Sequence, residues 1–419
     1  MSNFVDGSVR GRDSSDDMTW RGAAFVLLLC PTVAALATTP PIRPMTGALS
    51  IAWPLGSDEE FDAAYKALGT RHGFKIPEDY PATIREKSQS KNAGGTFADP
   101  TYELYVPKDY HHGRMLGLIV WINAGDSGAV PRAEWKSVLD KHHLIWVGPN
   151  DVGNNRDTLW RHYMATEAVR QARLRYTVDD ERVYVAGFSG GGRIASHVAV
   201  VNADTFTGGV FVAGCDFWRD IPVDPKQPRG KHYRGFWQKQ DGKILRIAKT
   251  TSRFVLLTGE TDFNRANTYA VHDAYKKDQY KHATLLDVPG MAHTVPDAGW
   301  FDKAIAALDE PLAPPAKLFE QAQKLTEKKK PGEACLAYGR AAVRGAGQPY
   351  AAEAVRKSMA IRKKYDATVA EIRAFIDKGK LDAAAKLNDA MKSLYTTLAE
   401  RQATEFSAEI RVKKLKRPR

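Results

Sequence analysis

The chain has 419 residues, of which 43% are hydrophobic and 10% aromatic, and its formal net charge is +12. This length predicts one large or two medium domains with a sizeable core. The charge is concentrated at one end, because residues 313–419 hold 24 Lys+Arg against 12 Asp+Glu and the rest is neutral. Residues 1–312 therefore lack the basic surplus of a nucleic-acid-binding protein, and we expect no nucleic-acid partner.

The first 37 residues have the organisation of a secretory signal peptide. Residues 1–17 are polar and show no periodicity, whereas Met18 opens a short cationic stretch that leads into the apolar run AAFVLLLC and a small-residue cleavage site at 35–37. We expect translation to start at Met18 and the protein to be secreted or periplasmic. About 15 apolar residues interrupted by Pro31 are too few to span a bilayer comfortably. Cys30 lacks the small residues that precede a lipidated cysteine.

Residues 38–95 open with a proline-rich stretch, contain one helical pattern at 59–68 and end polar and glycine-rich. We interpret them as an N-terminal extension and linker without visible chemistry. In residues 96–312, short apolar runs typical of buried strands alternate with helical patterns. The runs lie at residues 101–106, 116–122, 144–147, 183–185, 209–212, 254–257 and 284–288. The alternation predicts an α/β domain with a mostly parallel sheet and helices on both faces.

Residues 313–419 show no strand pattern and are predicted to form an all-helical extension. Apolar residues recur at helical spacing, and breaks at residues 330–332 and 377–380 favour helical hairpins. The segment resembles a tetratricopeptide-like array, although it lacks a regular period of about 34 residues. Residues 411–419 are predicted to be a disordered basic tail.

The two cysteines outside the leader, Cys215 and Cys335, lie far apart in the sequence and show no metal-ligand spacing. We predict that they are buried free thiols, with a Cys215–Cys335 bridge as the alternative. The sequence therefore predicts no metal site.

The motif GFSGG at residues 187–191 lies between a strand pattern at 182–186 and a helix pattern at 192–199. A serine between glycines at such a turn is a nucleophile elbow, because the turn is too sharp and crowded for side chains and exposes the serine hydroxyl. The five-residue pattern alone is weak, since composition produces it by chance. Its position makes Ser189 the candidate nucleophile.

A serine nucleophile needs a base that takes its proton and a carboxylate that orients the base. His293 follows the strand pattern at 284–288 in a glycine-containing loop, and Asp262 follows the preceding strand pattern. The order Ser189, Asp262, His293 is the one expected for an α/β-hydrolase triad. Asp216, in the loop after an earlier strand pattern, is the alternative acid.

Acyl transfer also needs N–H donors for the oxyanion. The backbone N–H of Gly190 is the first candidate, because this residue starts the helix after the serine. Gly125, in the loop NAGDSG after the strand pattern at 116–122, is the candidate for the second donor. Asp126 beside it would oppose an oxyanion, so we expect it to point away or to be held by a donor such as Arg156.

With these residues in view, the chain resembles the α/β-hydrolase superfamily, and within it the secreted serine esterases related to polyhydroxybutyrate depolymerases and feruloyl esterases. The matching segments are YVPKDY at 105–110, DERVYVAGFSGGGR at 180–193 and GMAH at 290–293, within about residues 101–309. The resemblance implies cleavage of carboxylic esters through an acyl-enzyme on Ser189, without metal or organic cofactor. The sequence NAG at 123–125 departs from the superfamily's His-Gly-Gly and leaves the second oxyanion donor open.

Two other functions fit parts of the sequence. The Gly-X-Ser-X-Gly-Gly form also occurs in prolyl-oligopeptidase-like peptidases, so peptide hydrolysis is the alternative reaction. From a different class, a non-catalytic protein would bind anionic envelope polymer or lipid head groups through its basic helices. For the esterase, the expected substrate is a small-molecule, polysaccharide or polyester ester.

Trp218 and Trp237 lie in an insertion between two strand patterns, a position that overhangs the active site in this fold. Aromatic and cationic side chains together suit a sugar ring or an aromatic acyl group. The two tryptophans are therefore candidate substrate-binding residues. Packing in the core of a small insertion is an equal alternative.

Overall fold

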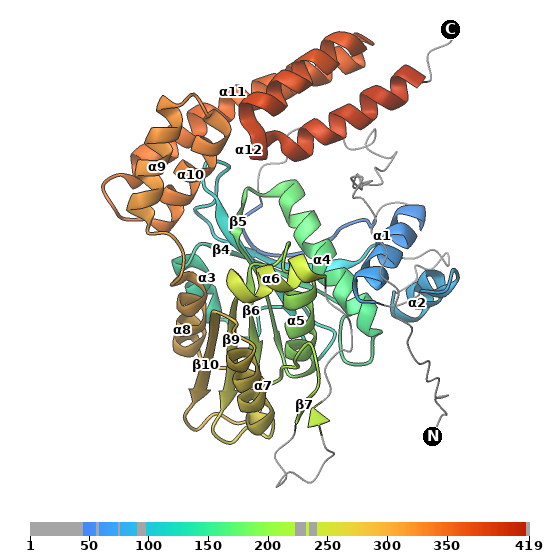
Figure 1. Ribbon diagram of the computed structural model, residues 1–419, viewed down its shortest axis with the longest axis vertical. Helices are drawn as coiled ribbons and strands as arrows, with labels where there is room; N and C mark the ends of the chain where they lie inside the picture. Colours follow the sequence, from blue (N-terminus) through green and yellow to red (C-terminus); the bar gives the residue numbers. More distant parts are fainter. Residues whose placement is uncertain are drawn as a thin grey trace, which may run out of the picture.

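The helices and strands are those of a computed structural model of the chain (Figure 1). It describes residues 45–55, 58–73, 76–89, 98–222, 232–233 and 241–415. The strands are β1 (Gly47–Ala52), β2 (Thr101–Val106), β3 (Leu116–Ile122), β4 (Leu144–Pro149), β5 (Val178–Phe188), β6 (Gly208–Val212), β7 (Ile221–Pro222), β8 (His232–Tyr233), β9 (Arg253–Gly259) and β10 (His282–Val288). The predicted leader and Trp237 lie outside the described residues.

The helices are interspersed with the strands up to α8, and from α8 to α12 they follow one another without strands. They are α1 (Asp58–Arg71), α2 (Tyr80–Ser88), α3 (Trp135–Lys141), α4 (Thr158–Arg175), α5 (Gly190–Val201), α6 (Gly242–Thr250), α7 (Arg265–Lys277), α8 (Ala298–Asp309), α9 (Pro315–Glu327), α10 (Pro331–Arg344), α11 (Ala351–Asp377) and α12 (Leu381–Leu415). The succession confirms the predicted α/β region with a helical extension after it.

Eight strands form one sheet in the order β1-β2-β4-β3-β5-β6-β9-β10, and β7 pairs with β8 separately. β2 runs antiparallel to its neighbours β1 and β4, whereas all pairs from β4 to β10 are parallel. The inner strands β3 and β9 are buried along their whole length, as expected of parallel strands with helices on both faces. This topology is the α/β-hydrolase fold, as the sequence predicted.

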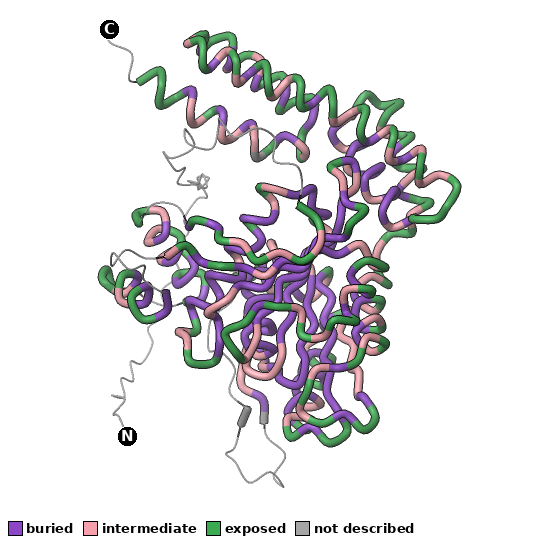
Figure 2. The backbone as a smooth tube through the Cα atoms, turned by 180° about the vertical axis from the view of Figure 1, so that it is seen from behind, coloured by how far each residue is buried: buried purple, intermediate pink, exposed green. Residues whose placement is uncertain are grey.

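Two hydrophobic clusters pack on opposite faces of the sheet, because successive side chains of a strand point to opposite sides. In β3, Val120 belongs to the cluster covered by α1 and α4 to α7, and Trp121 belongs to the cluster covered by α3 and α8. In the second cluster the rings of Trp135 and Phe301 stack with centroids 3.9 Å apart. Figure 2 shows the buried residues concentrated in the middle of the molecule. The sheet is therefore a rigid base for the loops at its edges.

The interval 38–95, interpreted from the sequence as an extension and linker, contains an additional strand. β1 pairs antiparallel with β2 along its whole length and forms one edge of the sheet. Its residues alternate between intermediate and exposed, so this strand lacks the apolar run that marks the inner strands. The helical pattern at 59–68 is confirmed by α1, whose Phe61 and Tyr65 are fully buried. The sheet thus begins with β1 rather than after residue 95.

The helical extension consists of the hairpins α9/α10 and α11/α12, and the long second hairpin extends away from the sheet (Figure 1). The two predicted breaks separate the helices within each hairpin. The prediction of a disordered tail from residue 411 is wrong for residues 411–415, which continue α12. α12 folds back on itself at Thr396, and Lys414 near its end pairs with Asp382 at its start, so this basic segment has a partner within α12. Residues 416–419 lie outside the described part.

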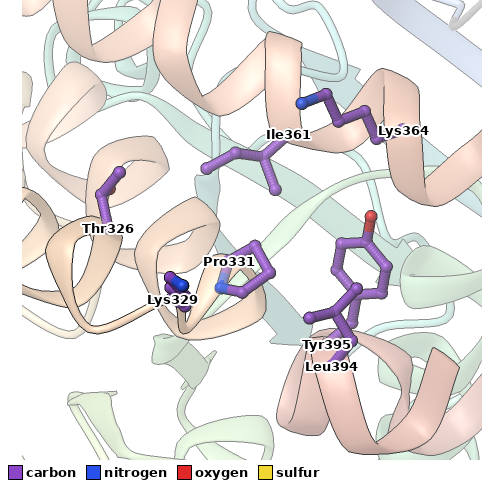
Figure 3. A pocket seen from close by; sticks show the side chains of 7 residues that line it. All are labelled: Thr326, Lys329, Pro331, Ile361, Lys364, Leu394 and Tyr395. Atoms are coloured by element: carbon purple, nitrogen blue, oxygen red, sulfur yellow. The ribbon is translucent and has the colours of Figure 1, made fainter. Parts of the chain in front are cut away.

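A shallow hollow of about 290 Å³ lies in the helical extension (Figure 3). It is lined by Thr326, Lys329, Pro331, Ile361, Lys364, Leu394 and Tyr395. α12 is interrupted next to it at Thr396, where φ is 41° and ψ is −120°. All of the lining residues come from α9 to α12 and their turns, so the hollow is separate from the edge of the sheet that carries Ser189.

Buried ion pairs join the helical extension to the start of β5. The carboxylate of Asp179, whose side chain is fully buried, lies 2.9 Å from Arg340 Nε and 2.6 Å from Arg344 Nη2 of α10. Glu181 pairs with the same two arginines. Burial by itself would raise the pKa of Asp179, but the neighbouring guanidinium charges hold this pKa below its usual value. Asp179 and Glu181 with Arg340 and Arg344 thus form a charged junction between β5 and α10, and Asp179 is its buried carboxylate.

Replacing Asp179 by alanine should lower the free energy of unfolding by about 3–5 kcal/mol, because two guanidinium groups lose their buried carboxylate. Urea unfolding of the full chain measures this change. The matched control is Asp180→Ala, which breaks an exposed pair with Arg173 and should cost about 1 kcal/mol or less. Equal effects of the two substitutions would contradict the role of Asp179.

The contribution of Asp179 should also depend on pH. Its pKa is lower in the folded than in the unfolded protein, so its stabilisation is complete above the unfolded value of about 3.9. It is lost as the pH falls through the folded value. The difference in stability between the wild type and Asp179→Ala should therefore be constant at neutral pH and shrink below about pH 4.

Cys215 and Cys335 are buried free thiols, which confirms that prediction and excludes the bridge between them. In the described part of the chain, no helix is long and apolar enough to cross a membrane. Among the same residues, no group of three or more His, Cys, Asp or Glu side chains is arranged to hold a metal ion.

Candidate active site

Ser189 occupies a strained turn between the end of β5 and the start of α5. Its φ of 56° and ψ of −120° are unfavourable for a residue with a side chain, at a cost of about 1–3 kcal/mol. Close backbone packing maintains the turn, since a Cβ on Gly191 would lie 2.0 Å from the carbonyl oxygen of Ile122 in β3. The glycine of the motif is therefore required by this close approach.

His293 and Asp262 reach Ser189 from the loops after β10 and β9. His293 Nε2 lies 2.9 Å from Ser189 Oγ, and His293 Nδ1 lies 2.8 Å from Asp262 Oδ1. The three residues are distant in sequence, but parallel strands bring their carboxyl ends to one edge of the sheet. The structure thus brings the three predicted residues together with the geometry of a Ser-His-Asp triad.

The carboxylate of Asp262 is fully buried and is oriented by two further donors. Thr258 Oγ1 donates to Oδ2 at 2.9 Å, and the backbone N–H of Asn264 donates to Oδ1 at 3.0 Å. The carboxylate is thereby held facing the imidazole. An acceptor at Nδ1 favours the tautomer that carries its proton there, and this leaves the Nε2 lone pair directed at the serine hydroxyl.

Asp216, the alternative acid, lies outside this hydrogen-bonded chain. It pairs with Arg193 and lies 3.1 Å from His197 Nε2, and both partners belong to α5. Burial would raise the pKa of Asp216, but the hydrogen bond from His197 and the charge of Arg193 hold this pKa below its usual value. The geometry therefore places Asp262, and not Asp216, next to His293.

The loop after β3 lies against the elbow, where both oxyanion donors were expected. Gly190 is the first residue of α5, so its N–H belongs to the helix terminus that has no intrahelical partner. In the β3 loop, the Ala124 N–H is already engaged by Asn123 Oδ1 at 2.8 Å. Gly125, the next residue, is exposed. It therefore stays the candidate for the second donor.

Asp126 is held by Arg156, as expected from the sequence. Its carboxylate accepts from Arg156 Nε at 3.2 Å and Nη2 at 3.1 Å, and from the Gly153 N–H at 2.8 Å. The hydrogen bonds from Arg156 hold the pKa of Asp126 below its usual value. The negative charge next to Gly125 is thus compensated by a guanidinium group from the segment after β4.

Trp218 is partly buried against the hydrophobic core, and its polar contact is with α7. Its Nε1 donates to Asp278 at the C-terminal end of α7, and its ring packs against the cluster that contains Phe217. Asp262 precedes the other end of this 13-residue helix, which is about 20 Å long. The packing alternative therefore describes the contacts of Trp218, while Trp237 lies outside the described residues.

Sequence analysis missed two residues at the site. The exposed ring of Phe263 stacks on His293. The amide of Asn154 covers Gly190, because a Cβ at that glycine would lie 2.1 Å from Asn154 Oδ1. Neither residue belongs to a motif. A phenylalanine directly after the triad acid, in a loop, was the one available signal.

No family model and no curated protein matches this chain. Solved structures with a similar fold include a ferulic acid esterase (14% identity, 62% of this chain and 96% of that chain, TM-score 0.39). They also include S-formylglutathione hydrolase from Staphylococcus aureus (14%, 52% and 91%, TM-score 0.36). A dipeptidyl-aminopeptidase-IV-type protein from Bacteroides ovatus is 17% identical, and the match covers 54% of this chain but 35% of that protein, with a TM-score of 0.37. At these identities and TM-scores, the assignment of function rests on the geometry of the site.

Proposed function

We propose that the protein is a serine hydrolase that cleaves carboxylic esters through an acyl-enzyme on Ser189. The observation that carries this proposal is the continuous hydrogen-bonded chain from Asp262 through His293 to Ser189 Oγ. It stands on a strained elbow at the carboxyl edge of the sheet, the edge at which ligands bind in α/β folds. Asp262 is buried and both of its carboxylate oxygens accept hydrogen bonds, so it holds His293 in the orientation that a general base needs.

In the proposed reaction, His293 Nε2 takes the proton of Ser189 as Oγ attacks the ester carbonyl carbon. The Gly190 N–H, with Gly125 as its expected partner, stabilises the oxyanion that develops. The bond to the alcohol oxygen then breaks, and the proton on Nε2 passes to that oxygen. Water, activated by the same imidazole, hydrolyses the acyl-enzyme and restores the serine.

A fluorophosphonate probe tests the proposal directly, because it reacts with activated serines. We expect one label per chain, located at Ser189 by peptide mass spectrometry, and loss of p-nitrophenyl acetate hydrolysis in proportion to labelling. Assays with acetyl, feruloyl, hydroxyalkanoate and peptide substrates then separate ester from peptide hydrolysis. An unlabelled Ser189 in folded, untreated protein would rule out the mechanism.

A further inference from the structure

Phe263 exposes its phenyl ring at the active site. Its residue surface is 76% exposed, and its ring centroid lies 4.0 Å from that of His293, with 29° between the planes. Leaving a large aromatic ring in water is unfavourable, and ligand sites are lined by aromatic side chains next to the few polar groups that orient the ligand. The ring covers part of the imidazole, but most of its own surface has no protein partner.

The backbone on either side of Phe263 is firmly held. Asp262 before it is buried, and Asn264 after it donates through Nδ2 to the Ala213 carbonyl oxygen at 2.8 Å. Phe188, the residue before the nucleophile, places a second ring 5.0 Å from the imidazole. The exposed ring of Phe263 therefore stands on an ordered support, as a preorganised binding surface requires.

The chemistry decides which half of an ester meets this ring. When the acyl-enzyme forms, His293 Nε2 must deliver its proton to the oxygen of the departing alcohol. The alcohol is therefore within hydrogen-bonding distance of the imidazole at that step. Since Phe263 stacks on the same imidazole, groups attached to the alcohol oxygen lie next to its ring. The acyl half extends instead from the carbonyl carbon bonded to Ser189.

We propose that Phe263 forms a subsite for the alcohol half of the substrate and binds a flat ring with an apolar face. This inference rests on the proposed esterase function and specifies its substrate class. An aryl alcohol and the CH face of a pyranose share this chemistry, since both stack on an aromatic side chain. The subsite consists of described residues only and needs no contribution from the insertion after Pro222.

The experiment compares esters with the same acetyl group and different alcohols: ethyl acetate, benzyl acetate and methyl 6-O-acetyl-glucopyranoside. In Phe263→Ala, kcat/KM for the ring-bearing substrates should fall about tenfold, mainly through a higher KM. The value for ethyl acetate should stay within a few-fold of the wild type. Phe263→Tyr keeps the ring and should retain activity on all three esters, whereas Phe263→Leu should behave like the alanine variant. Comparison of benzyl acetate with the acetylated glucoside shows whether the subsite binds an aryl alcohol or a pyranose.

An equal loss on ethyl and ring-bearing acetates would overturn the proposal, because Phe263 would then only support His293. Unchanged activity on all three esters would overturn it as well. The pH profile of kcat/KM for ethyl acetate provides a second readout, since a supporting role would shift this profile and a subsite would leave it unchanged. Failure of the esterase proposal is distinguishable, because the wild type would then hydrolyse none of the esters and Ser189 would carry no fluorophosphonate.

Discussion

Replacing Ser189 by alanine should lower kcat for p-nitrophenyl acetate by about six orders of magnitude. The substitution removes the nucleophile, so no acyl-enzyme forms. Hydrolysis of p-nitrophenyl acetate and fluorophosphonate labelling should be lost together. The fold should persist, because the elbow is held by backbone contacts of its glycines and alanine removes one hydroxyl.

The matched control is Ser137→Ala, on the exposed side of α3, which should leave both activity and labelling unchanged. Circular dichroism and urea unfolding show whether each variant is folded. Hydrolysis by folded Ser189→Ala at the wild-type rate would mean that another group attacks the ester. The triad geometry would then have no catalytic meaning.

Replacing Asp262 by asparagine should lower kcat by about four orders of magnitude at neutral pH. The amide has nearly the same shape as the carboxylate but carries no charge. With its carbonyl oxygen in place of Oδ1 it still accepts from Nδ1 and from the Asn264 N–H, but its NH₂ group then faces the Thr258 hydroxyl that donates to Oδ2. In either orientation the negative charge that stabilises the imidazolium is lost when His293 takes the serine proton. Steady-state kinetics should show the loss in kcat more than in KM.

Asp216→Asn tests the other candidate acid under the same conditions. Its partners are Arg193 and His197, and neither contacts Ser189 Oγ in the structure. This variant should lose stability, because the partly buried ion pair with Arg193 is weakened, while kcat of the folded fraction stays within a few-fold of the wild type. A large loss of kcat in Asp216→Asn and a small one in Asp262→Asn would show that Asp216 is the acid that orients His293.

The helical extension contacts the sheet where β5 begins, whereas the triad lies where the parallel strands end. Asp179, which binds α10, stands at the beginning of β5, and Ser189 follows its end. Ten residues of strand at about 3.3 Å each separate them by roughly 30 Å. The basic helices and their hollow are therefore remote from the reacting atoms. The extension meets the α/β domain through the Asp179 junction, so substitutions there should change stability before they change the chemistry.

The sequence was most informative where burial is complete. Inner parallel strands contain continuous apolar runs, so β3 and β9 could be recognised from the runs at residues 116–122 and 254–257. β1 could not, because an edge strand with alternating half-exposed residues resembles a linker. The prediction for residues 411–415 was wrong for a similar reason: their charge suggests disorder, but the first half of α12 packs beside them after the turn at Thr396.

The triad illustrates the same division. Glycine spacing and chain order were enough to select Ser189 and His293 as candidates. A sharp turn requires glycines around Ser189, and the loop that carries His293 follows a recognisable strand pattern. The choice between Asp262 and Asp216 needed the structure, because both follow strands and only spatial contact distinguishes them. Phe263 and Asn154 came entirely from the structure.

The sequence by itself thus determined the fold class, the elbow and the location of the charge, because these depend on local pattern and composition. Tertiary structure alone decided which carboxylate orients His293 and which ring lies beside the base. Each of these contacts joins loops that are distant in sequence, and they meet because parallel strands end at one edge of the sheet. Local pattern carries no record of such contacts.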